Sequence, residues 1–385
     1  MSRTTGTAVL CWCAVFLIAA SCRPAAAREA CRAPAPVCQA MAAVFPVAGY
    51  QPYASAVRIG PDLLVTNRHV VADEAVLTIR LGDGKTVKGE VLATDYPGDL
   101  VFVRATLPAG PTLSPAALAA EPRLFVLGQD VASREITVFA EGRVLVRPAT
   151  GHALARLHHS AHTQPGNSGG ALVDQDGRLV AIVASGGEGR YEAIPATELA
   201  RLRARSGPQH REASGVLGKS YRECDRVLDE ARRPRAEDRA RLVALLERWC
   251  SATGNRQHMD LAAQAVGRMR DLARSVSLFE RSLADDPNAI NTRVGLVVAL
   301  HLQRRWQEET PHLDWLLKII PRDPTVHRFA IQVGKWTGNS ALVARALALI
   351  EAHNPRAVEA AERFLADRRP PPQSGSGPRL PARPR

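Results

Sequence analysis

Hydrophobic and polar positions divide the chain into two regions with different periodicities. From about residue 41 to residue 200, short apolar or alternating runs are separated by turn residues, as in "SAVRIGPDLLVTNRHVV" and "GALVDQDGRLVAIVAS". Many short strands at regular spacing predict an all-β barrel or sandwich. From about residue 215 onward, apolar residues recur at helical spacing on either side of Pro234, which predicts an all-α second domain.

The helical region carries an internal repeat marked by proline. Pro287, Pro321 and Pro355 follow one another at equal intervals, at the ends of "LADDP", "KIIP" and "EAHNP". The interval matches the tetratricopeptide period of about 34 residues, in which paired helices end at such a proline. Arg293 and His327, however, occupy positions where an aromatic residue is usual. We expect degenerate tetratricopeptide-like repeats; the alternative is an irregular helical bundle with coincidental proline spacing.

Length and composition agree with two folded domains. The chain has 385 residues, which is longer than the chains that usually fold around one hydrophobic core, and 46% of its residues are hydrophobic. Its 50 Lys and Arg residues against 38 Asp and Glu residues give a formal charge of +12. Because these charges form no cluster with aromatic residues, we expect no nucleic-acid binding.

These patterns predict five segments, with a linker at "SGPQHREASG" between the two domains. The tail "RRPPPQSGSGPRLPARPR" contains no acidic residue and is expected to be disordered. The predicted segments are a signal peptide at 1–27, an N-terminal segment at 28–40, a β domain at 41–207, an α-helical domain at 215–367 and the basic tail at 368–385.

The N-terminus has the features of a secretory signal peptide. Arg3 precedes an apolar run over 8–20, and three alanines at 25–27 follow as a cleavage signal. A lipoprotein modified at Cys22 is an alternative, although Ala19 stands where leucine is preferred. No other run of about 18 apolar residues occurs, so we expect an exported protein, periplasmic or secreted, without a stable membrane span.

Four cysteines remain after removal of the signal: Cys31, Cys38, Cys224 and Cys250. An even number in an exported chain predicts disulfides, with three possible connectivities. Sequence proximity favours Cys31 with Cys38. The second pair stays open, because a helical hairpin turning near Pro234 would leave its members about 6–9 Å out of register, whereas a disulfide tolerates Cα separations of up to about 7 Å.

Three polar segments carry candidate chemistry. Ser168 lies in the glycine-rich "QPGNSGGAL", His69 ends the apolar strand of "LLVTNRHVV", and Asp99 begins "GDLVFVRA". Acyl transfer by serine needs a base for the hydroxyl proton, an acid that orients the base, and donors for the oxyanion. The alternative for the glycine-rich segment is a simple turn, in which serine is common.

"TNRHVV", "GDLVFVRA" and "QPGNSGGAL" resemble the active-site segments of trypsin-like serine peptidases, and they are most similar to the high-temperature-requirement (HtrA) branch. The resemblance covers about residues 41–205. It implies an all-β double barrel, each barrel with six strands, followed here by the all-α repeat domain. It also implies His69 as general base, Asp99 as its orienting acid and Ser168 as nucleophile.

The resemblance further implies an oxyanion hole formed by the backbone amides of Gly166 and Ser168, where a side chain at Gly166 would obstruct the bend. Digestive relatives have an aspartate before the serine, which pairs with a new N-terminus. This chain has Asn167, so activity should not require such cleavage. A helical domain also stands where the HtrA branch usually has a PDZ domain, which puts PDZ-type regulation and cage assembly in doubt.

Substrate contacts follow from the same resemblance. The edge of "ASGGEG" should pair with the substrate backbone as an added strand, through Ser185, Gly186 and Gly187. His162 and Thr163 should contribute to the floor of the specificity pocket. No acidic residue stands there, so small or medium apolar residues are favoured over Arg or Lys.

Two other kinds of site can be set against this interpretation. His158, His159 and His162 in "LHHSAHTQ" could suggest a metal site, but they fit a loop beside the pocket better, and we expect no metal and no cofactor. "GNSGG" also fits the nucleophile elbow of α/β-hydrolases, which needs a helix directly after the serine. A predicted β-hairpin follows here instead.

The sequence therefore predicts an exported serine endopeptidase acting on polypeptide substrates, with helical repeats that bind a substrate segment or a protein partner. The alternative is an exported protein-binding scaffold whose protease domain is vestigial.

Overall fold

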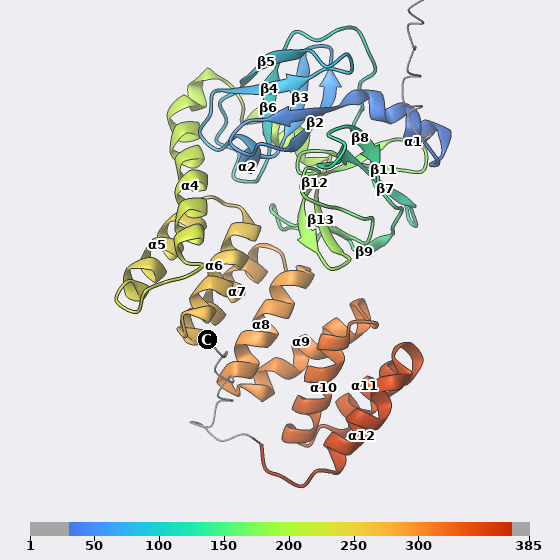
Figure 1. The fold of residues 1–385 in the computed structure, drawn as a ribbon, viewed down its shortest axis with the longest axis vertical. Coiled ribbons are helices and arrows are strands. Elements are labelled where there is room, and N and C mark those ends of the chain that lie inside the picture. The colour runs from blue at the N-terminus through green and yellow to red at the C-terminus, as the bar shows by residue number, and fades with distance from the viewer. Residues whose placement is uncertain (1–30, 372–385) are drawn as a thin grey trace, which may run out of the picture. The chain divides into compact units, whose positions relative to one another are not determined.

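Six antiparallel strands close the first barrel (Figure 1). The structure, a computed structural model, describes residues 31–371, so the predicted signal peptide and residues 372–385 of the predicted tail lie outside it. The turn residues "GPD" at 60–62 and "GDG" at 82–84 each join two neighbouring strands. In pairing order the strands are β1 (Val44–Ala48), β2 (Ala54–Gly60), β3 (Leu63–Thr66), β6 (Val101–Arg104), β5 (Thr86–Val91) and β4 (Val76–Arg80).

The second sheet has seven strands, where the sequence predicted a barrel of six. The difference arises in "EITVFAEGRVLVRP", which breaks at Gly142 into two short strands at opposite edges of the sheet. A Cβ at Gly142 would lie 1.9 Å from the Ala161 nitrogen, so the chain can bend there only with glycine. In pairing order the strands are β8 (Ile136–Val138), β7 (Leu124–Gln129), β11 (Ala171–Asp174), β12 (Leu179–Gly187), β13 (Arg190–Pro195), β10 (Leu157–His159) and β9 (Val144–Val146).

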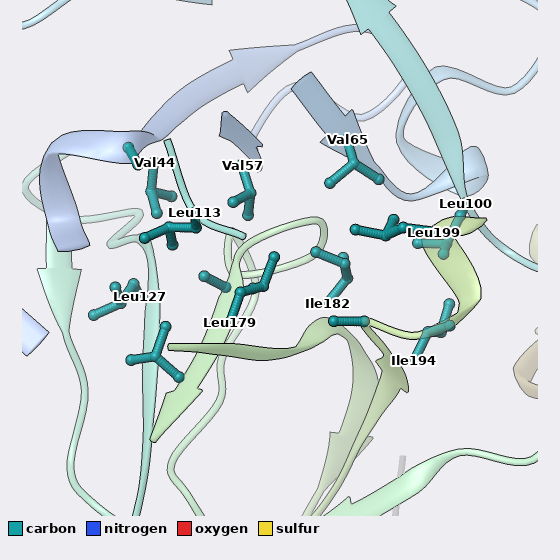
Figure 2. Packing of buried hydrophobic residues seen from close by; sticks show 14 of the residues in the cluster. Val44, Val57, Val65, Leu100, Leu113, Leu127, Leu179, Ile182, Ile194 and Leu199 are labelled. Carbon is teal, nitrogen blue, oxygen red and sulfur yellow. The ribbon is translucent and has the colours of Figure 1, made fainter. Parts of the chain in front are cut away.

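A hydrophobic cluster joins the two β units (Figure 2). Val57 and Val65 from the first barrel face Ile182 and Leu179 from the second sheet, and all four side chains are fully buried. Leu199 of α3 (Glu198–Ala204) closes one end of this cluster. Burial of apolar surface is the main stabilising term in such a core, so the two units should hold a fixed orientation.

The helical region consists of α4 to α12 and reaches residue 366. Asn or Asp side chains cap α6, α7, α10 and α11 at their first turns, which satisfies backbone donors that the helix cannot. The helices are α4 (Arg211–Glu230), α5 (Arg239–Ser251), α6 (Arg256–Arg268), α7 (Leu272–Asp285), α8 (Ile290–Gln303), α9 (Trp306–Ile319), α10 (Pro324–Thr337), α11 (Ser340–His353) and α12 (Val358–Ala366).

The helices repeat with the period that the prolines predicted. The first helices of three successive hairpins, α6, α8 and α10, begin at positions 256, 290 and 324. Their second helices, α7, α9 and α11, begin at positions 272, 306 and 340, so both series advance by the same interval as the prolines. Two apolar clusters, one centred on α6 and α7 and one on α9 to α11, fill the spaces between these helices.

The prediction of a linker at 206–215 is wrong. Residues 208–210 form a 3-10 turn and α4 already begins at Arg211, so no flexible connection separates the β region from the helices. Residues 33–371 belong to one compact unit. The physical reason is packing: Ser214 and Gly218, in the first turns of α4, are buried or closely approached by the first barrel.

The predicted disulfides and the predicted lack of a membrane span can also be compared with the structure. Cys224 of α4 and Cys250 of α5 form a disulfide with a Cα–Cα distance of 4.8 Å, which resolves the pair that hairpin counting left open. Cys31 and Cys38 are also disulfide-bonded. Among the described helices, none combines the length and apolar character that crossing a bilayer requires.

Candidate active site

His69 and Asp99 are brought together by neighbouring strands of the first barrel. His69 lies in α2 (Arg68–Val71), which directly follows β3, and Asp99 lies just before β6. Thr66 at the end of β3 pairs with Val101 at the start of β6, so the segment after β3 meets the segment before β6. The His69 ring nitrogen Nδ1 is 2.7 Å from Asp99 Oδ2, and the His69 backbone N–H donates to Asp99 Oδ1 at 2.9 Å.

Asp99 is held as a buried carboxylate. Only 1% of the residue is exposed, and burial by itself would raise the pKa of its carboxyl group. The charge of His69 and its hydrogen bonds outweigh this and hold the Asp99 pKa below its ordinary value. Asn67 also fixes the segment, because its side-chain nitrogen donates to the Asp99 carbonyl oxygen at 2.9 Å. The carboxylate can therefore keep the imidazole in one orientation.

Ser168 lies on a turn that only glycine can complete. Gly166 and Gly169 have φ angles of +95° and +79°, in the left-handed region that favours glycine. A Cβ at Gly166 would lie 2.6 Å from the Gln129 carbonyl oxygen. Asn167 is buried beneath the turn: its side-chain nitrogen donates to Gln129 O at 3.1 Å, and its side-chain oxygen accepts from the Gln164 backbone N–H at 2.8 Å.

Ser55 ties this turn to the first barrel, although no motif in the sequence marks it as a site residue. Its hydroxyl donates to Gly166 O at 2.8 Å and accepts from the Gln129 backbone N–H at 2.8 Å. Its own backbone N–H donates to Ser168 O at 2.8 Å. A serine within an apolar strand carries no signal of such a role, because its hydroxyl's partners lie in the second β unit, far along the chain.

The hydroxyl of Ser168 donates to Ala184 O at 3.4 Å, and among the described residues no hydrogen bond joins it to His69. The backbone amides of Gly166 and Ser168 donate to no other residue in the part of the chain that the structure describes. Two unengaged N–H groups on one turn, beside a hydroxyl, are the donors that a developing oxyanion requires.

The predicted substrate edge has one free side. Residues Ser185, Gly186 and Gly187 of β12 pair with β13 on one side, whereas β11 pairs with β12 only as far as Ile182. No other described strand covers the second side. The Ser185 hydroxyl itself is turned into the protein, where it accepts from Arg156 Nη1 at 2.9 Å. The edge therefore offers backbone groups rather than the serine side chain.

The remaining predicted site residues take no part in the hydrogen bonds of Ser168. His162 is exposed, and its ring contacts Tyr191 with a 3.3 Å approach to the hydroxyl. Thr163 donates to Ala161 O at 3.2 Å. His159 is buried with its ring 6.0 Å from that of Tyr191, and burial lowers its pKa to about 3. Among residues 31–371, no group of three or more His, Cys, Asp or Glu side chains is arranged to hold a metal ion.

A buried ionic network lies between the second sheet and the helices. Glu192 of β13 accepts from Arg156 at 3.3 Å and from Arg256 of α6. Arg256 also donates to Asp260 at 3.1 Å and to the Thr292 hydroxyl at 2.7 Å. Burial alone would raise the Glu192 pKa, but its cationic neighbours, Arg256 foremost, hold it at about 2. Asp260 has the opposite balance, and burial raises its pKa to about 6.

A groove of about 1370 Å³ extends from the free edge of β12 along residues of the helices α6 to α10. Its walls include β12 residues Ser185 to Gly187 and apolar side chains of the helical region, among them Leu302 and Trp336. Leu302 is 54% exposed, which is unusual for a large apolar residue. The groove thus begins at the edge expected to take a peptide and continues along the repeats.

Four arginines also line this groove: Arg190 is paired with Glu188 and Asp323, and the other three are Arg268, Arg270 and Arg304. These last three lie at the α6–α7 and α8–α9 connections, and these connections are neighbours because Gln303 donates to Leu272 O at 2.8 Å. No ion pair neutralises any of the three within the described chain. The groove therefore combines apolar walls with uncompensated positive charge.

Comparison with known proteins matches the β region. Residues 54–182 match the family model described as "Trypsin-like peptidase domain". An HtrA-like serine protease of Staphylococcus epidermidis is 32% identical over 168 residues, which cover 38% of this chain and 28% of that protein. A Do-like HtrA serine protease of Lactobacillus helveticus is 27% identical over 164 residues, covering 37% and 39%. This chain thus spans well under half the length of either relative.

Among solved structures, the HtrA-type protease AlgW with tripeptide aligns over 44% of this chain and 61% of its own, at 24% identity and a TM-score of 0.39.

Proposed function

We propose that this chain, whose residues 54–182 form a trypsin-like peptidase domain, is an exported serine endopeptidase of the HtrA type that cleaves polypeptides. The observation that carries the proposal is the 2.7 Å contact between the His69 ring and the buried Asp99 carboxylate. Full burial of a carboxylate is costly. A histidine without a catalytic role would not need a buried carboxylate beside it, whereas a histidine that acts as general base needs that carboxylate to orient its ring.

The proposed reaction is acyl transfer through Ser168. The Ser168 oxygen attacks the peptide carbonyl carbon while His69 takes the hydroxyl proton at its other ring nitrogen. Asp99 keeps the Nδ1 proton in place and stabilises the imidazolium that forms. The amides of Gly166 and Ser168 donate to the developing oxyanion, and one such donor is worth about 2.7–4 kcal/mol. His69 then protonates the leaving amine. Water next attacks the acyl carbon while His69 takes a proton from it, and His69 returns the proton to the Ser168 oxygen as the acid is released.

The hydroxyl must turn from Ala184 toward His69 for this reaction. A side-chain hydroxyl moves between staggered positions by rotation about one bond. Catalytic hydrogen bonds are also often absent or long in a free enzyme and form in the substrate complex. The 3.4 Å bond to Ala184 O is long, so the cost of leaving it is small.

The proposed substrate is an extended chain that pairs with Ser185 to Gly187 and continues into the helical groove. Backbone hydrogen bonds at the free edge supply sequence-independent affinity. The groove begins at this edge and carries Arg268, Arg270 and Arg304. Their positive charge favours an acidic sequence in the part of the substrate that lies along the helices. Export agrees with the disulfide between Cys224 and Cys250, because such bonds persist in oxidising compartments.

Charge reversal at the groove should weaken binding of an acidic peptide. Arg268→Glu and Arg304→Glu, tested singly, should each raise the Kd of a fluorescent acidic peptide roughly 5- to 30-fold, because an attraction of up to about 1 kcal/mol becomes a repulsion of similar size. Fluorescence anisotropy measures the change, with Arg356→Glu as a control outside the groove. Equal weakening by the control, or equal binding of an uncharged peptide, would contradict an acidic occupant.

A fluorophosphonate probe tests the catalytic proposal. The full chain should form one covalent adduct, which mass spectrometry locates at Ser168, and Ser168→Ala should form none. The bond of the Ser168 hydroxyl to Ala184, rather than to His69, is the observation that favours the scaffold alternative. Folded protein without an adduct would therefore reject the peptidase and support the scaffold.

A further inference from the structure

The first helix of the helical region packs directly against the helix that carries His69. α4 approaches closely at Gly218, where a Cβ would lie 2.4 Å from Ala72 O and 2.7 Å from Asp73 Cα. Arg222 of α4 donates to Asp73 at 2.6 Å and stacks over the Tyr50 ring at 4.6 Å. α4 is thus fixed to the residues that directly follow α2.

Arg68, the residue before His69, depends on α4 for a hydrogen-bond acceptor. It is 2% exposed, and its guanidinium donates to the Ser214 hydroxyl at 2.7 Å and, more weakly, to Ala72 O at 3.3 Å. No carboxylate forms an ion pair with it within the described chain. Burial accordingly lowers the Arg68 pKa from its ordinary value. A buried cation with so few partners would reorganise if Ser214 were lost.

Tyr221 lies one turn beyond Gly218, on the part of α4 that packs against the residues directly after α2. The residue is fully buried, its ring packs 5.0 Å from that of His258, and its hydroxyl makes no hydrogen bond to a described residue. Burial raises the Tyr221 pKa well above its usual range, and the Asp99 carboxylate is the charged group that raises it further. An unpaired buried hydroxyl is rare, and here its charged neighbour is the proposed catalytic acid.

We propose that α4 is part of the catalytic site and that Tyr221 is a positioning residue, which donates a hydrogen bond to Asp99 when the site is occupied. This inference rests on the proposed peptidase function. Asp99 already accepts from the His69 ring and backbone, and a third donor would satisfy a remaining lone pair of a buried carboxylate. The helical region would then support the chemistry as well as bind substrate.

Tyr221→Phe in the full chain tests the inference, because it removes the hydroxyl and keeps the ring. We expect the limiting rate of fluorophosphonate labelling to fall about 10- to 100-fold, as for loss of a hydrogen bond to a charged group. The probe concentration at half-maximal rate should not change. The acidic limb of the pH–rate profile should move to higher pH, because Asp99 becomes more basic and the His69–Asp99 pair holds its proton more strongly.

Tyr96→Phe is the matched control. Tyr96 is also buried and lies near Asp99, but its hydroxyl donates to Glu198 at 2.9 Å, so the substitution removes a comparable hydroxyl that is bonded to a different carboxylate. The labelling rate and pH profile should stay as in the wild type. If Tyr221→Phe also keeps the wild-type rate and profile, the inference is overturned, although wild-type labelling would leave the peptidase proposal intact.

Ser214→Ala gives a second measurement should Tyr221→Phe lose its fold. It removes the acceptor of Arg68 beside His69 without changing a large side chain. We expect labelling to slow about 10-fold, the scale of one unsatisfied buried group. A wild-type rate in this variant would overturn the claim that α4 belongs to the catalytic site. An absence of labelling in the wild type would instead reject the proposed function itself.

Discussion

Replacing Asp99 with Asn should lower kcat about 10⁴-fold with little change in KM or fold. The reason lies in the two contacts of the carboxylate. Oδ1 accepts from the His69 backbone N–H at 2.9 Å, so the amide oxygen of the introduced asparagine must occupy that position. The amide NH₂ then faces Nδ1 in place of Oδ2, which lies 2.7 Å away in the wild type. Because both would be donors, His69 must carry its proton on the other nitrogen, where it cannot accept from Ser168.

Hydrolysis of unfolded casein by the full chain measures this effect, with Asp83→Asn as the control. Asp83 lies in an exposed turn and pairs with Lys85 at 2.9 Å, away from the His69 segment. The control should keep wild-type kcat. A tenth or more of the wild-type rate in Asp99→Asn would mean that the tautomer of His69 does not limit the reaction, and His69 would lose its role as general base.

Replacing Arg256 with Met should lower the free energy of unfolding by about 3–5 kcal/mol, because it leaves a buried carboxylate without its main partner. Arg256 is 2% exposed and donates to Glu192, Asp260 and the Thr292 hydroxyl. Methionine fills a similar volume, so the loss is chiefly electrostatic. Urea unfolding followed by the fluorescence of Trp249, Trp306, Trp315 and Trp336, all in the helical region, measures the change.

The loss of unfolding free energy in Arg256→Met should depend on pH. The folded-state pKa of Glu192, about 2, lies below its ordinary value, so this group stabilises the wild type above about pH 4.5 and loses that effect as the pH falls toward 2. Without Arg256 the pKa rises, and protonation relieves the unpaired charge at low pH. The difference between Arg256→Met and wild type is therefore largest near neutral pH and narrows on acidification.

Arg241→Met on α5 is the control for the Arg256 experiment. Arg241 pairs with Asp238 at 3.2 Å, but its side chain is 49% exposed, and such surface pairs contribute at most about 1 kcal/mol. If Arg256→Met destabilises the protein no more than Arg241→Met does, the buried network does not hold the helices to the second sheet.

Local patterns were sufficient for much of the fold. The turns at 60–62 and 82–84 could be read from glycine, proline and aspartate, since these residues satisfy the dihedral demands of a turn by themselves. The helical repeat could be read from three evenly spaced prolines, since proline ends helices through its own ring. The candidate triad came from short motifs in their order along the chain.

The errors arose where distant residues set the outcome. The second sheet has seven strands and not six because the chain bends at Gly142 against Ala161, which alternation of apolar residues cannot reveal. Hairpin counting left the pairing of Cys224 with Cys250 open, because the non-helical connection at 231–238 does not follow the rise of a helix. Residues 206–215 have linker composition, yet α4 begins within them because the first barrel buries it.

Sequence alone established which kinds of residues were available for catalysis, where most strands and helices fall, and the period of the repeats, because each depends on local patterns. Tertiary packing alone decided that Ser55 joins the Ser168 turn to the first barrel, that Arg256 and Glu192 join sheet to helices, and that Ser214 of α4 accepts from Arg68 beside His69. The partners in each case are far apart along the chain and belong to different elements. Only burial of a shared apolar core can bring such groups into contact, and no local pattern encodes it.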